Sequence, residues 1–148
     1  MPLKLSIVTA QRTVMERADV TKLVVPAAEG QITLLPSHAA LMTALGSGEM
    51  LATHAGGTEP IAVHGGFLQI VDDEVSVLAD AAEHVAQIDL ERAEAARARA
   101  EARLTGRDTS IPPGGLDVLR AQASLQRSMV RITIVRRRRA TGVPSARP

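Results

Sequence analysis

Apolar and polar side chains alternate along the first half of the chain. Residues 3–7 (LKLSI) and 75–77 (VSV) repeat with a period of two, which is typical of strands that bury one face. Gly, Pro and Asp interrupt this pattern at intervals of about 8–12 residues. Further runs rich in β-branched residues occupy 20–25, 31–35, 49–53, 61–64 and 67–71. The spacing predicts an antiparallel β-sandwich or barrel.

A helical pattern replaces this alternation after residue 86, where Ala, Arg and Glu dominate. Asp89 suits an N-cap and Gly106 suits the end of a helix, so the sequence predicts one helix over residues 89–105. Its apolar positions form a narrow stripe with helical spacing, Leu90, Ala93, Ala96, Ala100 and Leu104. Because most of these side chains are small, a second helix could approach closely.

A second helix is predicted from residue 116 to about residue 133, because apolar residues again recur with helical spacing. Residues 112–115 (PPGG) cannot continue a helix and therefore predict the turn between the two. We expect the Arg-rich tail, residues 136–148, to be disordered. A short, Ala-rich hairpin buries little apolar surface, so its docking on another domain should be marginal and reversible.

The composition limits the class of protein. A chain of 148 residues can bury one modest core, or one compact domain with a small appendage, which argues against a multidomain enzyme. It has no cysteine and no His-x-x-x-His pair, so we expect neither disulfides nor a metal site. The start of the chain lacks the pattern of a signal peptide, and residues 30–48, although uncharged, are too polar for a membrane span. We expect a cytoplasmic chain that meets membranes only peripherally.

Charge divides the chain into an acidic and a basic half. Residues 1–87 contain 4 Lys/Arg and 10 Asp/Glu, whereas residues 88–148 contain 13 and 6, so the net charges are −6 and +7. All 13 cations of the second half are arginines, whose planar guanidinium groups bind carboxylates and phosphates. The second half is therefore predicted to bind anionic partners.

Three other classes of function fit the sequence less well. The run of four arginines at 136–139 suggests a nucleic-acid-binding module, but with no Trp or Tyr and one Phe the chain lacks aromatic side chains on which bases could stack. A lipid-facing hairpin would need larger apolar residues than alanine.

Residues 64–66 (HGG) are similar to a lipase oxyanion loop, but no G-x-S-x-G motif accompanies them, and the glycines predict a tight hairpin instead. No Walker motif is present, so any bound ATP would be a ligand and not a substrate.

Four motifs in order resemble one protein family. They are LLPSHAAL at residues 34–41, VHGGFLQI at 63–70, VSVLADAAE at 75–83 and IDLERA at 88–93. Together they are similar to the epsilon subunit of bacterial F-type ATP synthases, over residues 1 to about 133. The chain departs from the family pattern at Ala40, where proline is usual, at residues 111–115 and in the Arg-rich tail.

The resemblance implies a β-sandwich followed by an antiparallel two-helix hairpin. It implies a sandwich over residues 1–87 that binds the rotor and a regulatory hairpin over 88–135, and it leaves the Arg-rich tail over 136–148 as an extra segment. Such a subunit is not catalytic. It would bind the gamma subunit and the c-ring, couple proton flow to ATP synthesis, and inhibit ATP hydrolysis when its hairpin extends toward the alpha and beta subunits. It would lie peripherally on the cytoplasmic face of the bacterial plasma membrane.

The resemblance also implies two sets of site residues. A regulatory ATP would bind at Ile88, Asp89, Arg92, Arg127 and Arg131, to which we add Glu83 and Arg99. The rotor interface would include Glu29, Gln31, Pro36, His38 and Leu41. No catalytic residue, required cofactor or metal ligand is implied.

The nucleotide site has a simpler structural alternative. Asp89 could serve only as an N-cap, and the arginines could be solvated partners of the helix carboxylates, Glu91, Glu94 and Glu101. When the hairpin extends, the same cations could contact acidic surfaces of the alpha and beta subunits. Nucleotide binding and this second contact would require different conformations.

Overall fold

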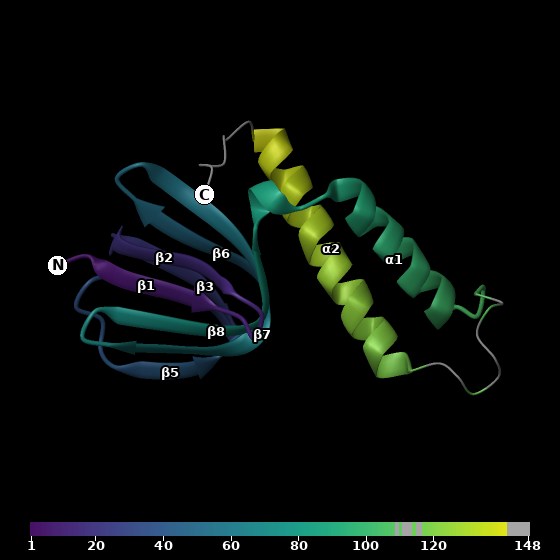
Figure 1. The fold of residues 1–148 in the computed structure, drawn as a ribbon, viewed down its shortest axis with the longest axis horizontal. Helices are drawn as coiled ribbons and strands as arrows, with labels where there is room; N and C mark the ends of the chain where they lie inside the picture. The colour runs from purple at the N-terminus through teal and green to yellow at the C-terminus, as the bar shows by residue number, and fades with distance from the viewer. Residues whose placement is uncertain (109, 111–113, 115–116, 142–148) are drawn as a thin grey trace.

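The structure is a computed structural model that describes residues 1–108, 110, 114 and 117–141. Eight strands form a sandwich and two helices form a hairpin beside it (Figure 1). The elements are β1 (Leu3–Val8), β2 (Thr13–Val20), β3 (Lys22–Ala27), β4 (Gly30–Leu34), β5 (Leu41–Ala44), β6 (Ser47–His54), β7 (Gly57–Val71), β8 (Glu74–His84), the short 3₁₀ helix η1 (Val85–Gln87), α1 (Leu90–Leu104) and α2 (Val118–Thr141). The predicted order, a β-sandwich followed by two helices, is confirmed.

The longest strand, β7, joins the two layers of the sandwich. The strands follow the order β2-β1-β8-β7-β6-β3-β4, and β5 pairs separately with β7. The first part of β7 pairs with β6 and the second part with β5, so the sheet curves over its own core (Figure 1). One pair, β1 with β8, is parallel, so the prediction of an antiparallel sandwich is wrong for this pair. These strands lie at opposite ends of the domain sequence, and no tight turn has to join them.

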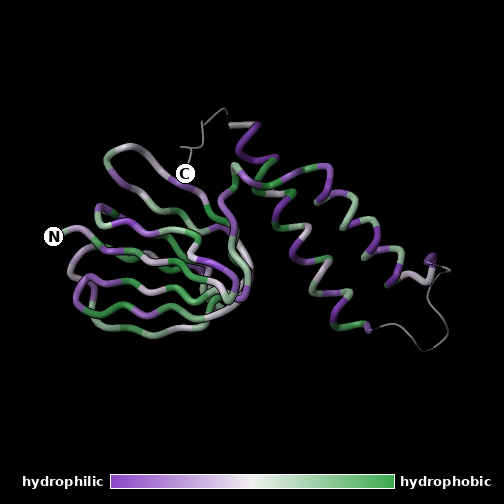
Figure 2. The backbone as a smooth tube through the Cα atoms, viewed as in Figure 1, coloured by the Kyte–Doolittle hydropathy of each residue, from purple (hydrophilic) through white to green (hydrophobic). Residues whose placement is uncertain are grey.

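The core contains the alternate residues that the sequence pattern predicted. Leu3, Leu5 and Ile7 of β1 and Val75 and Val77 of β8 are buried between the layers. Their polar neighbours face outward, and the strands in Figure 2 change from hydrophobic to hydrophilic along their length. The short β5 and the largely exposed edge strand β2 were not predicted, because neither has a clear two-residue period.

The tight hairpin expected at residues 64–66 is not formed. Gly65 and Gly66 lie inside β7, so the segments predicted as two strands, 61–64 and 67–71, are one strand. Gly66 has a φ of 111°, and a Cβ there would lie 2.1 Å from the carbonyl oxygen of Leu78. The glycines therefore permit the close approach of β8 where β7 bends. The turn itself is formed by Asp72 and Asp73, which both have positive φ.

The first helix begins and ends as predicted. Asp89 is the N-cap, and its side chain accepts a hydrogen bond of 3.1 Å from the backbone N–H of Arg92. At the other end the chain leaves α1 through Thr105 and Gly106, whose φ is 75°. Ala93 and Ala100 of the small-residue stripe are buried, as expected for close packing on α2.

The second helix is longer than predicted. It continues to Thr141, so residues 136–141 are helical and the expectation of disorder from residue 136 is wrong. Tertiary ion pairs explain the difference, because Arg136 binds Glu94 of α1 at 2.6 Å and the next two arginines bind the sandwich. Residues 142–148 lie outside the described residues, as does most of the predicted turn at 112–115.

Candidate functional site

Strands β6, β7 and β8 present a docking face to the hairpin. Glu49 pairs with Ala62, and Ala62 pairs with Glu83, so the three side chains form one row across the sheet. At the centre of the row, Ala62 packs with Ile134 and Val135 of α2 in a small cluster separate from the sandwich core. The docking face therefore has an apolar centre with a carboxylate on each side.

Arginines of α2 bind both carboxylates of the docking face. The guanidinium group of Arg131 donates to Glu83. Arg137 and Arg138 donate to the two oxygens of Glu49 at 2.8 and 2.6 Å. The Glu49 side chain is only 10% exposed, so these bonds are partly shielded from water. In the docked conformation these arginines bind the chain's own carboxylates, which gives no support to a nucleic-acid-binding tail.

A polar cavity of about 400 Å³ lies where β8, the linker η1 and both helices meet. Its lining consists of Glu83, Gln87, Ile88, Asp89, Arg92, Ala93, Ala96, Arg99 and Arg131. Six of the seven residues predicted for ATP are therefore brought together. The seventh, Arg127, is not in the lining. It lies near the buried His64, and its positive charge disfavours protonation of that imidazole.

The cavity has a suitable charge distribution for an anionic ligand with a polar base or sugar. Arg92 and Arg99 form no ion pair with any described residue, so both are available for charge-assisted bonds to phosphate. Arg131 is already bound by Glu83 and would have to exchange this partner. Asp89 acts as an N-cap, as the simpler alternative predicted, and also borders the cavity.

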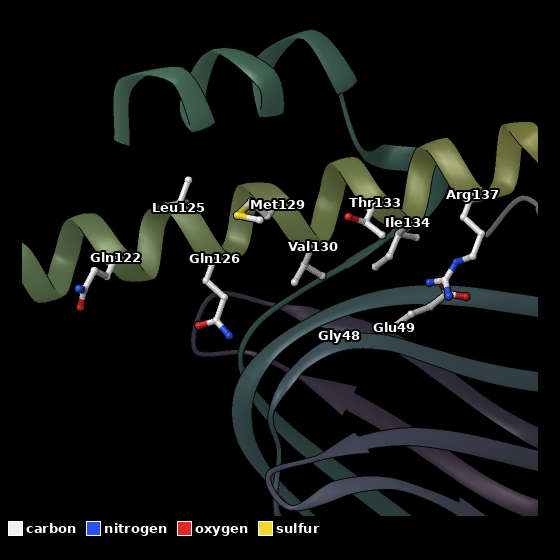
Figure 3. Close-up of a pocket in the computed structure, with 10 residues that line it drawn as sticks. All are labelled: Gly48, Glu49, Gln122, Leu125, Gln126, Met129, Val130, Thr133, Ile134 and Arg137. Carbon is white, nitrogen blue, oxygen red and sulfur yellow. The ribbon is translucent and has the colours of Figure 1, made fainter. Parts of the chain in front are cut away.

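The apolar groove in Figure 3 is less suited to such a ligand. It measures about 410 Å³ and runs between α2 and the start of β6, lined by Leu125, Met129 and Val130 among others. Its two charged residues, Glu49 and Arg137, bind each other. Without an unpaired cation in its lining, this groove would hold a polyphosphate poorly.

Two buried histidines lie near the junction of the domains. His64 is 5% exposed and, among the described residues, neither ring nitrogen has a hydrogen-bond partner. Burial, and then the charges of Arg131 and Arg127, lower its pKa to about 4. Burial also lowers the pKa of His84, whose Nδ1 accepts from the backbone N–H of Ala86 at the start of η1. Sequence reasoning missed His64 and Glu49, although the two-residue period places His64 on the same face as Ala62.

The predicted rotor residues lie at two ends of β4. Glu29 lies in the turn between β3 and β4, and Gln31 is the second residue of β4. Pro36 and His38 follow the other end of the strand, where the backbone N–H of Ser37 donates to Asp73 at 2.6 Å. The fifth residue, Leu41, begins β5 and packs partly on the core. The structure does not gather these residues into one small patch, because about 13 Å of strand separates the two ends.

No helix in the described part of the chain is long and apolar enough to cross a membrane. Nor do the His, Asp and Glu side chains of residues 1–108, 110, 114 and 117–141 form a cluster that could hold a metal ion.

Comparison with known proteins identifies the family. Residues 2–85 match the ATP synthase delta/epsilon chain β-sandwich domain, and residues 86–136 match the delta/epsilon chain long α-helix domain. The ATP synthase epsilon chain of Dehalococcoides mccartyi is 44% identical over 137 residues, which cover 93% of this chain and 94% of the relative. That of Symbiobacterium thermophilum is 39% identical over 130 residues, covering 88% and 90%.

The fold recurs in a solved structure. A chain of the Euglena gracilis mitochondrial ATP synthase, in an assembly of OSCP, F1 and c-ring, superposes with a TM-score of 0.75 at 18% identity, covering 90% of this chain and 81% of that chain. Because the two sequences are only 18% identical, this similarity is evidence for a shared fold alone. The two domain matches together span nearly the whole described sequence, and on that ground the chain belongs to the delta/epsilon chain family of ATP synthases.

Proposed function

We propose that this chain is a non-catalytic central-stalk subunit of an F-type ATP synthase. The observation that carries this proposal is the match of both family domains in order, over almost the full length of the relatives. As a rotor subunit it would bind the gamma subunit and the c-ring through its sandwich and help couple proton flow to ATP synthesis. This role would hold it peripherally at the cytoplasmic face of the bacterial plasma membrane.

The hairpin would regulate ATP hydrolysis by leaving the sandwich. Its contact with the docking face consists of a small apolar cluster and ion pairs on both sides. Such a contact can be exchanged for another, because little apolar surface has to be exposed. Once released, the arginines of α2 would be free to contact acidic surfaces of the alpha and beta subunits.

ATP in the polar cavity would oppose this release. The lining residues come from β8, the linker and both helices, so a ligand there would contact the sandwich and the hairpin together. A ligand that binds only the docked form shifts the equilibrium toward it. The charges of Arg92, Arg99 and Arg131 support a polyphosphate as the ligand.

The test is an add-back experiment with a catalytic complex that lacks this subunit. ATP hydrolysis is measured after addition of the full chain or of a version that ends at Gln87. We expect both to bind, and only the full chain to slow hydrolysis. If neither version binds the complex, the central-stalk proposal is wrong. If both bind and hydrolysis is equal, the stalk role stands and regulation by the hairpin does not.

A further inference from the structure

His64 lies on the docking face, in the row next to Ala62. It projects to the same side of β7 as Ala62, because residues two apart in a strand share a face. Its cross-strand partners are Ser47 of β6 and Ala81 of β8, and α2 covers this side. The side chain is therefore buried by the docked hairpin, with both ring nitrogens lacking a hydrogen-bond partner among the described residues.

The charges that act on His64 are positive. Arg127 and Arg131 of α2 both disfavour a proton on its ring. The nearest row on the sheet contains two carboxylates, and arginines of α2 already bind both. Arg131 binds Glu83. Arg137 and Arg138 bind Glu49. The directly opposite residues on β6 and β8 carry no charge. A protonated His64 would thus be buried beside two cations without a carboxylate of its own.

We propose that His64 makes hairpin docking sensitive to pH, so that a proton on its imidazole releases α2 from the sandwich. Nothing else in the contact needs to titrate. Release would expose the ring to water and remove Arg127 and Arg131 from it. Combined with the proposed function, on which this consequence rests, acidification would shift the subunit toward the conformation that inhibits hydrolysis.

The direction follows from the two conformations. Docked, His64 has a pKa of about 4, against an ordinary pKa of 6.5 once the ring is exposed. The released form therefore binds the proton more tightly. At a pH above the ordinary pKa of histidine, docking is unaffected by this group. Docking weakens as the pH falls from 6.5 toward about 4, the pKa of His64 in the docked form. From about pH 7 to about pH 5.5 the docking constant should fall roughly eightfold.

A cysteine-labelling experiment on the full chain tests this inference. The chain has no native cysteine, so Val135→Cys places a single thiol in the docking cluster, where Val135 is 7% exposed. Leu119→Cys supplies an exposed reference on the same helix, since Leu119 is 79% exposed. The ratio of the two labelling rates, measured at each pH, reports the fraction of released hairpin and cancels the pH dependence of the thiol reaction.

His64→Gln is the decisive variant and His38→Gln its matched control, because His38 lies beyond β4, away from the hairpin. We expect the labelling ratio to rise roughly eightfold on acidification in the unsubstituted and His38→Gln backgrounds, and by less than about twofold with His64→Gln. A ratio that rises equally with His64→Gln, or that does not rise in the unsubstituted background, overturns the inference. If His64→Gln does not fold, the protonation of His64 is followed instead in the unsubstituted chain, by the NMR resonance of its imidazole. A His64 ring that becomes protonated while the hairpin stays docked would also contradict the inference.

This outcome is separate from that of the add-back experiment. The labelling assay uses the isolated chain and needs no catalytic complex. A failed add-back with a pH-dependent labelling ratio would remove the proposed function but not the switch, whereas the reverse result would remove only the switch.

Discussion

Arg138 of α2 donates to Oε1 of Glu49 on β6 at 2.6 Å, across 89 positions of sequence. Arg137 binds the other oxygen of the same carboxylate at 2.8 Å. The end of α2 is thereby attached to the sandwich at a residue that is shielded from water. This contact explains why the helix continues into an Arg-rich segment whose like charges would oppose helix formation in an isolated peptide.

Glu49→Gln is expected to weaken docking by about 1–2 kcal/mol, because it removes the charge from a partly buried contact with two arginines. The labelling ratio of the Val135→Cys thiol should rise accordingly, while denaturant unfolding of the sandwich stays unchanged. Glu29→Gln, which removes an exposed carboxylate from the turn between β3 and β4, is the control. Equal labelling in the two variants would show that Glu49 does not hold the hairpin.

Arg92→Ala is expected to weaken ATP binding by about tenfold or more, because Arg92 lines the polar cavity and has no ion pair among the described residues. Calorimetric titration of ATP into the full chain measures the effect. Arg120→Ala is the control, since Arg120 is an exposed arginine of α2 outside the cavity lining. Unchanged affinity for Arg92→Ala, or no binding to the unsubstituted chain, would contradict the nucleotide proposal.

Substitutions of Asp89 separate its role as an N-cap from a role in ligand binding. Asp89→Ala removes the bond to the N–H of Arg92 and should cost α1 about 1 kcal/mol. Asp89→Asn keeps an oxygen that can cap the helix but removes the charge. We expect Asp89→Asn to retain helical circular dichroism and to lower ATP affinity. If it binds ATP as the unsubstituted chain does, Asp89 is only a cap.

Gly66→Ala should destabilise the sandwich by more than about 3 kcal/mol, because its Cβ would lie against the carbonyl of Leu78 at a positive φ. Gly57→Ala is the matched comparison. Gly57 also has a positive φ, of 127°, but nothing within 4 Å of a Cβ, so only backbone strain of about 1–2 kcal/mol is expected. Urea unfolding of both variants checks this. Equal losses would mean that close approach of β8 is not the reason for the glycine.

His84→Asn should make the stability of the sandwich less dependent on pH. Burial lowers the pKa of His84, so the unfolded chain binds a proton more readily, and stability is lost as the pH falls below the ordinary histidine range. Asn can still accept from the N–H of Ala86. Thermal unfolding between about pH 7 and about pH 5 should show a smaller drop than in His38→Asn. An equal drop would assign the pH dependence to other groups.

Local chemistry determined much of this protein from sequence alone. The alternation in residues 3–7 predicted a strand with Leu3, Leu5 and Ile7 in the core, because the pleat places alternate side chains on one face. Asp89 and Gly106 marked the ends of α1, because capping involves only neighbouring backbone groups. The resemblance of the motif at residues 88–93 to the family also implied Asp89 and Arg92 as site residues, and both line the polar cavity.

Only the tertiary structure decided the contacts between distant segments. The parallel pairing of β1 with β8, the bend at Gly66 and the attachment of Arg138 to Glu49 each depend on elements far apart in the chain. A local pattern has no information on which segment will lie opposite. The sequence therefore predicted a tight turn at Gly66 and a disordered tail from Arg136. Likewise, only the packing of α2 on the sheet buried His64 beside Arg127 and Arg131.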